Sequence, residues 1–195
     1  MSLRHIVYEF IKRRKIGTLK KRNFYSFGKN SIIEKPYLQL SGLKGVSIGN
    51  EVTILKNCRL AVYGEISNES IIIGDRTYIG FGFTALSTSS STIKIGKDVL
   101  FASNVLISSE NHGIDPELGI PYMNQNLTSE DVSIDDGCWI GEKVIILPGV
   151  HIGKNSIVGA GSIVTKSIPD YSIAAGNPAR VIKKYDFTKK RWEKI

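Results

Sequence analysis

Branched apolar residues recur every six positions in the second half of the chain. Isoleucine or valine occupies a run of such positions: Ile134, Ile140, Ile146, Ile152, Val158 and Val164. The same spacing appears earlier, at Ile73 and Ile79 and at Ile95, Phe101 and Ile107. A period of six fits neither the roughly 3.6 residues of an amphipathic helix nor the alternation of an ordinary strand. It predicts a short strand and a tight corner in each hexad, with three hexads closing one triangular coil.

Residues at equivalent hexad positions are expected to share one environment. The first residue points into the prism, and a compact fifth residue also faces inward: Cys138, Val144, Val150, Ser156, Ser162 and Ile168. The second place often holds glycine, as at Gly141, Gly153 and Gly159, which permits a positive φ or a close backbone approach. Coils stacked about 4.8 Å apart pair their backbone groups with neighbouring coils. The sequence therefore predicts an all-β parallel β-helix with an isoleucine and valine core.

The units IGEKVI, IGKNSI and VGAGSI resemble those of the hexapeptide-repeat acyltransferases, and so does the closing segment VGAGSIVTKSIPDYSIAAGNPARVIKK. The resemblance covers residues 46–182 and is nearest to the maltose, galactoside and exopolysaccharide O-acetyltransferases. It implies a left-handed parallel β-helix, which is an exception to the right-handed crossover rule. It further implies a homotrimer, acetyl-CoA as co-substrate and acetyl transfer to a hydroxyl group.

The basic charge of the chain is concentrated at its two ends. The 195 residues suit one domain and carry a formal net charge of +8. Residues 1–22 contribute +7 and residues 183–195 contribute +4, which leaves −3 for the body between them. A mildly acidic body argues against a nucleic-acid partner. We expect one domain over 1–195, with an N-terminal extension (1–30), a β-helix (46–182) and a basic C-terminal tail or short helix (183–195).

The N-terminal extension carries an apolar stripe at helical spacing. It comprises Leu3, Ile6, Val7, Phe10 and Ile11 and precedes a basic run. The short helix that this predicts either caps the first coil or contacts an anionic membrane surface. No stretch has the pattern of a signal peptide or a membrane span, which predicts a cytoplasmic protein. Two cysteines are too few for a disulfide framework, so we expect buried free thiols.

The period of six stops after Ile107 and resumes out of step at Ile134. The intervening residues 108–131 are too many and too polar for a repeat unit, and they predict a loop that leaves the prism. This loop contains His112, whose neutral imidazole suits removal of a proton from a hydroxyl. The resemblance implies that His112 is the general base. Glu110, Asp115 or a backbone carbonyl could orient it.

The resemblance also implies an oxyanion donor, and the places of other residues along the sequence predict contacts with the acceptor. A backbone N–H of Gly141 or Glu142 is expected to stabilise the negative charge on the thioester oxygen. Asn111, Asp115 and Trp139 are expected to contact the acceptor, within a pocket built from residues 78–91 and 108–131. Trp139 could instead line the thioester pocket or pack at a subunit interface.

The closing segment combines small residues with cations, which suits a long pantetheine arm and its phosphates. The residues expected to bind acetyl-CoA are Ala160, Gly161, Thr165, Lys166, Asn177, Pro178, Arg180 and Lys183.

Two other chemistries receive little support from the sequence. Cys138 occupies a core position, so direct transfer is favoured over a covalent cysteine intermediate. Zinc carbonic anhydrases of the same fold need three histidines, whereas this chain has His5, His112 and His151, the first of which lies in the extension. We therefore expect no metal.

The leading functional hypothesis is an O-acetyltransferase that acts on a sugar hydroxyl in cell-surface polysaccharide synthesis. One alternative is N-acetylation of an amino sugar or acetylation of a xenobiotic, which would use the same base. Another is a non-catalytic β-helix scaffold. The sequence leaves the identity of the acceptor open.

Overall fold

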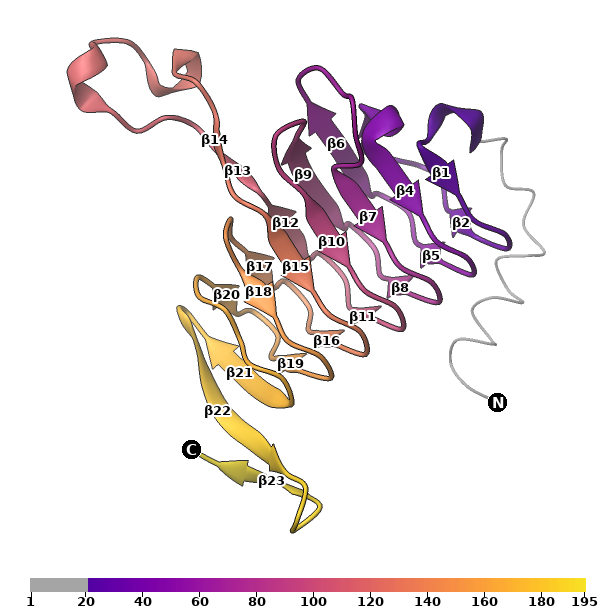
Figure 1. The fold of residues 1–195 in the computed structure, drawn as a ribbon, viewed down its shortest axis with the longest axis vertical. Helices are drawn as coiled ribbons and strands as arrows, with labels where there is room; N and C mark the ends of the chain where they lie inside the picture. Colours follow the sequence, from indigo (N-terminus) through magenta and orange to yellow (C-terminus); the bar gives the residue numbers. More distant parts are fainter. Residues whose placement is uncertain (1–20) are drawn as a thin grey trace.

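The computed structural model describes residues 21–195 and folds them into a three-sided parallel β-helix (Figure 1). Each turn of the chain places one short strand on each of three sheets, called faces A, B and C below. The helix expected near the N-terminus lies outside the described residues. Within them, no helix has the length and apolar character needed to cross a bilayer.

Neighbouring strands of one face come from successive coils and run parallel. Face A contains β1 (Ser26–Phe27), β4 (Val46–Ile48), β7 (Ile71–Ile73), β10 (Ile93–Ile95), β15 (Val132–Ile134) and β18 (His151–Ile152). Face B contains β2 (Ile32–Ile33), β5 (Thr53–Ile54), β8 (Tyr78–Ile79), β11 (Leu100–Phe101), β16 (Trp139–Ile140) and β19 (Ile157–Val158). Face C contains β3 (Gln39–Ser41), β6 (Arg59–Tyr63), β9 (Thr84–Thr88), β12 (Leu106–Ser108), β17 (Ile145–Ile146) and β20 (Ile163–Val164).

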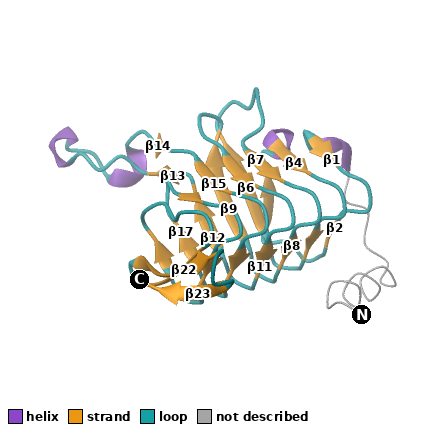
Figure 2. Ribbon diagram, turned by 60° about the horizontal axis from the view of Figure 1, so that its bottom comes forward, coloured by secondary structure: helices purple, strands orange, loops and turns teal. Residues whose placement is uncertain are grey.

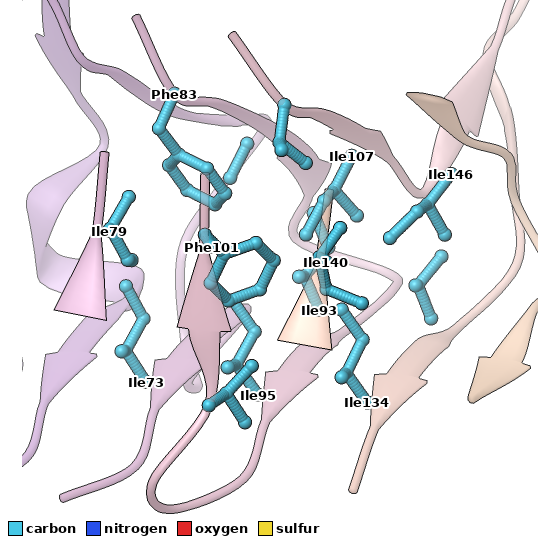
Figure 3. Close-up of a cluster of buried hydrophobic side chains, with 14 of the residues drawn as sticks. Ile73, Ile79, Phe83, Ile93, Ile95, Phe101, Ile107, Ile134, Ile140 and Ile146 are labelled. Atoms are coloured by element: carbon cyan, nitrogen blue, oxygen red, sulfur yellow. The ribbon is translucent and has the colours of Figure 1, made fainter. Parts of the chain in front are cut away.

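The expected ladder of branched side chains forms the core, as Figure 3 shows for the central coils. Every first-place and fifth-place residue of the hexads between Ile134 and Ile168 is buried. On face A, Ile73, Ile95 and Ile134 hold equivalent register positions on successive strands. Burial of one such side chain contributes about 1.5–3 kcal/mol. The period of six therefore repeats one stabilising contact per strand, and the prediction of a parallel β-helix is confirmed.

The glycines in the second place of the hexads serve close approach rather than a positive φ. A Cβ on Gly141 would lie 2.6 Å from the amide nitrogen of Ala160 in the next coil. The positive φ of the corner falls two residues later, at Lys143 (57°) and Asn155 (51°). Of the two reasons for glycine that the sequence allowed, stacking of the corners is therefore the one that applies.

The solenoid begins earlier than residue 46. Strands β1, β2 and β3 form a complete first coil, and the 3-10 helices η1 (Lys21–Asn23) and η2 (Leu43–Gly45) flank it. This coil escaped the sequence pattern because its hexads are irregular. Its core positions Phe27, Ile33 and Leu40 are six and then seven residues apart, and η2 separates it from the second coil.

The C-terminal residues form strands rather than a tail or a helix. After β20 the chain adds β21 (Ser172–Gly176) to face B and then reverses direction. β22 (Ala179–Asp186) and β23 (Arg191–Lys194) extend the sheet as an antiparallel hairpin. The pair Tyr185 and Trp192 packs edge to face with ring centroids 5.3 Å apart. Such cross-strand aromatic pairs stabilise a two-stranded hairpin.

An arm projects from the prism between β12 and β15 (Figures 1 and 2). Its base is a short antiparallel ladder of β13 (Glu110–Asn111) and β14 (Thr128–Ser129). Two 3-10 helices, η3 (Pro116–Leu118) and η4 (Tyr122–Asn124), lie between these strands in sequence. The arm therefore has a fixed root on the prism and an exposed outer part.

Candidate active site

Buried hydroxyl groups anchor the root of the arm. The Ser109 hydroxyl donates to the Ser87 hydroxyl at 2.9 Å and lies 2.9 Å from that of Ser91. Thr88 joins the network through Ser91 at 3.1 Å. Ser87 and Ser109 are completely buried. Because each hydroxyl finds a partner, the network fixes the chain direction at the point where it leaves face C.

His112 follows β13 directly and its side chain is exposed. Further along the arm, the buried Gln125 receives the Asp115 amide at 3.0 Å and donates to the Asp115 carbonyl oxygen at 2.7 Å. The Asp115 carboxylate accepts the Glu117 amide at 2.8 Å and thereby caps η3. Beyond His112 the arm is therefore held by its own hydrogen bonds. The Asp115 carboxylate contributes one of them by capping η3. Asn111 is exposed and pairs with Thr128 at the base.

The expected site residues occupy two different corners of the prism. The B–C corner, between faces B and C, contains residues 141–144 and 159–162 and, in the last coil, the turn after β21. The C–A corner, between faces C and A, contains residues 147–149 and 165–167, and the arm leaves from it. His112, Thr165 and Lys166 therefore lie at the C–A corner. The remaining residues expected to bind acetyl-CoA, except Lys183 on β22, lie at or beside the B–C corner.

The two amides proposed to stabilise the oxyanion differ in their bonding. The Gly141 amide donates to the Val158 carbonyl oxygen at 2.8 Å, so it belongs to the ladder between coils and is not available to a ligand. That expectation for Gly141 is wrong, because Gly141 directly follows β16 and its amide makes the next hydrogen bond of the same ladder. The Glu142 amide enters no ladder bond within residues 21–195, while the Glu142 carbonyl oxygen accepts the Gly161 amide at 2.7 Å. Glu142 is therefore the better candidate.

A buried serine brings two parts of the B–C corner together. The Ser162 hydroxyl donates to the Gly159 carbonyl oxygen at 2.6 Å and accepts the Gly176 amide at 3.0 Å. The exposed Asn177 and Pro178 therefore lie beside the exposed Ala160 and Gly161. A Cβ at Gly161 would meet open space, and its φ is +71°. This corner leaves room for a narrow ligand along its surface.

Cations flank the B–C corner on the hairpin. Arg180 is exposed and lies opposite Ala175 in the antiparallel ladder. Its Nη1 donates to the Ala179 carbonyl oxygen at 2.9 Å. Lys183 is half-buried and pairs with Ile173. Arg180 therefore lies next to the corner, and Lys183 lies further along the hairpin.

Trp139 and Cys138 point in opposite directions from β16. Trp139 is 50% exposed on the outer surface of face B, between Leu100 and Ile157 in the ladder. Cys138 is buried, and its thiol contacts the Gly153 carbonyl oxygen at 3.1 Å. Burial raises the pKa of Cys138 to about 11. It therefore remains a thiol near neutral pH, which agrees with direct transfer. Cys58 is likewise a buried free thiol.

Sequence reasoning missed the buried hydroxyl network. Residues 87–91 were expected to help build the acceptor pocket, but Ser87, Thr88 and Ser91 are buried beneath the arm. The signal was present as the polar run STSSS, which begins within β9 and continues beyond its end. Its meaning depends on Ser109, which the fold brings alongside from the next coil.

Comparison with known proteins agrees with this architecture. The model of a family described as bacterial transferase hexapeptide (six repeats) matches residues 131–166. A protein of Escherichia coli named "Putative lipopolysaccharide biosynthesis O-acetyl transferase WbbJ" is 35% identical over 158 residues, which is 76% of each chain. Galactoside O-acetyltransferase of the same organism is 44% identical over 114 residues, or 58% of this chain and 54% of that protein.

A solved structure extends the likeness over more of the fold. It is a mutant of AntD, an N-acyltransferase from Bacillus cereus, in complex with dTDP-4-amino-4,6-dideoxyglucose and coenzyme A. It superimposes with a TM-score of 0.72 at 28% identity and covers 87% of this chain and 88% of that one. The left-handed β-helix expected from the hexapeptide units is thus confirmed.

Proposed function

The chain belongs to the bacterial hexapeptide-repeat transferase family and is an acyltransferase, and on this premise we propose that it transfers an acetyl group from acetyl-CoA directly to a sugar hydroxyl. We propose cell-surface polysaccharide synthesis as the setting, because WbbJ is named for lipopolysaccharide biosynthesis. The observation that carries the proposal is the pair of half-sites: an exposed histidine at one corner, and an amide outside the ladder at the other.

His112 would act as the general base. Its imidazole would take the proton from the acceptor hydroxyl as the oxygen attacks the thioester carbonyl carbon. The Glu142 N–H would donate to the carbonyl oxygen, which becomes negatively charged in the transition state. As the carbon–sulfur bond breaks, His112 would return the proton to the sulfur of coenzyme A. No covalent bond to the protein is required, in keeping with the buried Cys138 thiol.

The B–C corner would bind acetyl-CoA. The open surface at Ala160 and Gly161 leaves space for the pantetheine arm, and the turn at Asn177 and Pro178 would border it. Arg180 and Lys183 would meet the phosphates. Lys166, with Thr165 beside it, would reach them from the C–A corner of a neighbouring copy. The acceptor would contact Asn111, Asp115 and Trp139. Because acetyl-CoA is made inside cells, we place the reaction in the cytoplasm.

The separation of the half-sites supports a homotrimer. His112 stands at the C–A corner and Glu142 at the B–C corner, so the width of face C separates them within one chain. Chemistry requires reacting groups to lie within about 3–3.5 Å of each other. A cyclic assembly would place the C–A corner of one copy against the B–C corner of the next. One groove between each pair of copies would then hold a complete site.

N-acylation of a nucleotide-linked amino sugar is the second candidate. The specific support is AntD, whose complex holds such a sugar together with coenzyme A. An amino group would use the same base and the same oxyanion donor. The two candidates differ only in the acceptor pocket.

The test supplies the full-length protein with acetyl-CoA and separate panels of sugars, nucleotide amino sugars and chloramphenicol. Thiol release is measured for the wild type and for His112→Ala. We expect turnover with a sugar and a loss of about 10²–10⁴-fold in kcat for the variant. Turnover only with an amino sugar would favour the second candidate. Full activity in His112→Ala would remove the histidine from the mechanism.

A further inference from the structure

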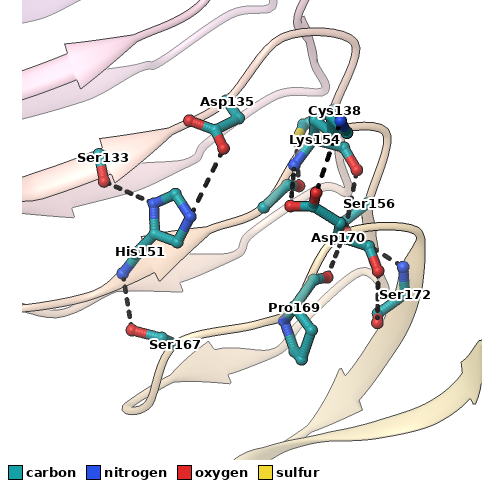
Figure 4. Close-up of polar contacts among 11 residues, drawn as sticks. Ser133, Asp135, Cys138, His151, Lys154, Ser156, Ser167, Pro169, Asp170 and Ser172 are labelled. Atoms are coloured by element: carbon teal, nitrogen blue, oxygen red, sulfur yellow. Dashed lines mark hydrogen bonds and ion pairs between the residues drawn. The ribbon is translucent and has the colours of Figure 1, made fainter.

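A second polar cluster lies along face A (Figure 4). It begins next to the C–A corner, where the His151 amide donates to the Ser167 hydroxyl at 3.0 Å. It comprises Asp135, His151 and Asp170, whose donor atoms all lie within 4.8 Å of one another. The three residues are sixteen and nineteen positions apart in sequence and come from successive turns of the solenoid. Motif searches along the sequence therefore cannot detect them as a set. Their side chains are each between 45% and 49% exposed, so solvent reaches all of them.

A hydrogen bond at Nδ1 holds the imidazole of His151 in one orientation. Its Nδ1 lies 2.7 Å from the Ser133 hydroxyl, on the neighbouring strand of face A. The ring therefore directs Nε2 towards Asp135, with a separation of 3.5 Å between Nε2 and the nearer carboxylate oxygen. Histidines that bind metals usually have their second nitrogen fixed in this way by another polar group.

The distance between His151 Nε2 and the Asp135 carboxylate is close to that between two ligand atoms of one metal ion. It is long for a strong hydrogen bond between an imidazole and a carboxylate. Two ligands on one tetrahedral zinc, each about 2.0–2.1 Å from the metal, stand about 3.3 Å apart. Asp170 closes the third side. Its Oδ1 accepts the Lys154 amide at 3.1 Å, so its Oδ2 would be the oxygen that turns towards the ion. Solvent can supply a fourth ligand.

The same residues do not form a nucleophilic triad, although serine, histidine and aspartate are adjacent. The amides of Ser133 and Asp135 donate to the carbonyl oxygens of Val150 and Ile152 at 3.0 and 2.9 Å. Both are thus consumed by the ladder between coils, and neither can stabilise an oxyanion beside the Ser133 hydroxyl. The cluster has the ligand atoms of a metal site, but it lacks the free N–H groups that a hydrolase needs to stabilise an oxyanion.

One cation already borders the cluster. Lys154 Nζ lies 3.8 Å from an Asp170 oxygen and 5.5 Å from the centre of the Tyr171 ring. The pair is half exposed, so its attraction is weak. A metal ion that binds Asp170 would displace the ammonium group, which can remain over the ring. A pocket of about 240 Å³, lined in part by Ser133, Asp135 and Lys154, opens beside the cluster.

We propose that Asp135, His151 and Asp170 bind one divalent transition-metal ion, with Zn²⁺ as the reference ion, and thereby link successive coils beneath the arm. A ligand set of imidazole and carboxylates favours zinc, nickel or cobalt over magnesium and calcium. The site is separate from the transfer reaction, for which no metal is needed. Its occupation would stabilise the end of the solenoid that carries the B–C corner residues.

The experiment uses the full chain after treatment with a chelator. Zinc chloride is titrated by calorimetry, and bound metal is counted after equilibrium dialysis. We expect one equivalent per chain and a higher unfolding temperature with zinc than without it. His151→Ala and Asp135→Asn should each weaken binding by at least about tenfold. Lys154→Met should tighten it several-fold, because the competing charge is removed.

His112→Ala is the matched control, since it removes the other exposed histidine of the described chain. It should leave zinc affinity unchanged and thus separates this site from the catalytic one. The proposal is overturned if the wild type shows no saturable binding, or if His151→Ala binds as tightly as the wild type. Loss of binding in His112→Ala alone would assign the ion to the arm and also overturn it. None of these readouts depends on acetyl transfer.

Discussion

The hydroxyl of Ser162 accepts the amide hydrogen of Gly176 at 3.0 Å. This hydrogen bond joins two segments that belong to successive coils. One segment is the glycine-rich B–C corner, and the other is the turn that opens the C-terminal hairpin. Because both segments are expected to contact acetyl-CoA, this single buried group determines how they face each other.

Ser162→Ala should therefore weaken the binding of acetyl-CoA. It leaves the Gly176 amide and the Gly159 carbonyl oxygen without their partner, at a cost of about 1–3 kcal/mol in the free energy of unfolding. We expect the KM for acetyl-CoA to rise more than the KM for the acceptor. Ser156→Ala is the control, because Ser156 is equally buried and bonds Pro169 and Ser172 at another corner. An equal rise in both variants would contradict the role of Ser162.

Glu142→Pro tests the backbone donor. Proline removes the N–H but leaves the rest of the corner, and this N–H enters no ladder bond in the described chain. We expect kcat to fall by about 10²–10³-fold. Glu142→Ala, which keeps the N–H, should stay near the wild-type rate. Circular dichroism verifies that both variants fold. Similar kcat values for the two folded variants would reject the Glu142 amide as the oxyanion donor.

Mixed assemblies test whether two chains share one site. His112→Ala and Glu142→Pro should each be inactive alone, because each lacks one half-site. Unfolding them together and refolding them should restore up to about a quarter of wild-type activity, since that share of grooves would combine two intact corners. Activity is measured by thiol release after separation of the assemblies by size. A mixture as inactive as its components would place the whole site within one chain.

Ser109→Ala tests the anchor of the arm. Loss of its hydroxyl bonds to Ser87 and Ser91 should let the arm root move, which would displace His112. We expect kcat to fall while the KM for acetyl-CoA changes little, because most residues of that site lie at the B–C corner. Ser31→Ala provides the comparison, since Ser31 is buried in the first coil and bonds the Gly49 carbonyl oxygen at 2.6 Å. If both variants lost stability and neither lost kcat, Ser109 would be structural only.

Burial of the Cys138 thiol should make the free energy of unfolding depend on pH in the alkaline range. Its thiol has a raised pKa of about 11 in the folded protein, against an ordinary value of 9.0, because burial disfavours the thiolate. The folded state thus holds its proton more tightly than the unfolded state. Its stabilising contribution is complete below about pH 9 and is lost as the pH rises towards 11. Urea unfolding at pH 8 and pH 10 should show a smaller loss of stability in Cys138→Ala.

The same variant also examines the reaction route. Because Cys138 points into the core, Cys138→Ala should keep kcat within a few-fold of the wild type. A decrease as large as that of His112→Ala would require a covalent step through the thiol.

The sequence by itself determined the scaffold. A period of six with branched first-place residues can bury those residues only if successive coils stack in register, so Ile134 had to meet its counterparts Ile95 and Ile152. The break in the period also located the arm and its histidine. The first coil and the C-terminal hairpin were not predicted, because irregular hexads and a switch to antiparallel pairing do not follow the period.

Only the tertiary structure decided which groups are available for chemistry. Gly141 and Glu142 are adjacent and looked equivalent in sequence, but the Gly141 amide is used by Val158 of the next coil. Likewise, Ser109 finds Ser87, and His151 finds Asp135, across coils rather than along the chain. Hydrogen-bond partners in a solenoid are set by stacking, which brings distant residues within reach. The pattern along the sequence determined whether a side chain faces the core or the solvent. The stacking of coils determined which residues it contacts.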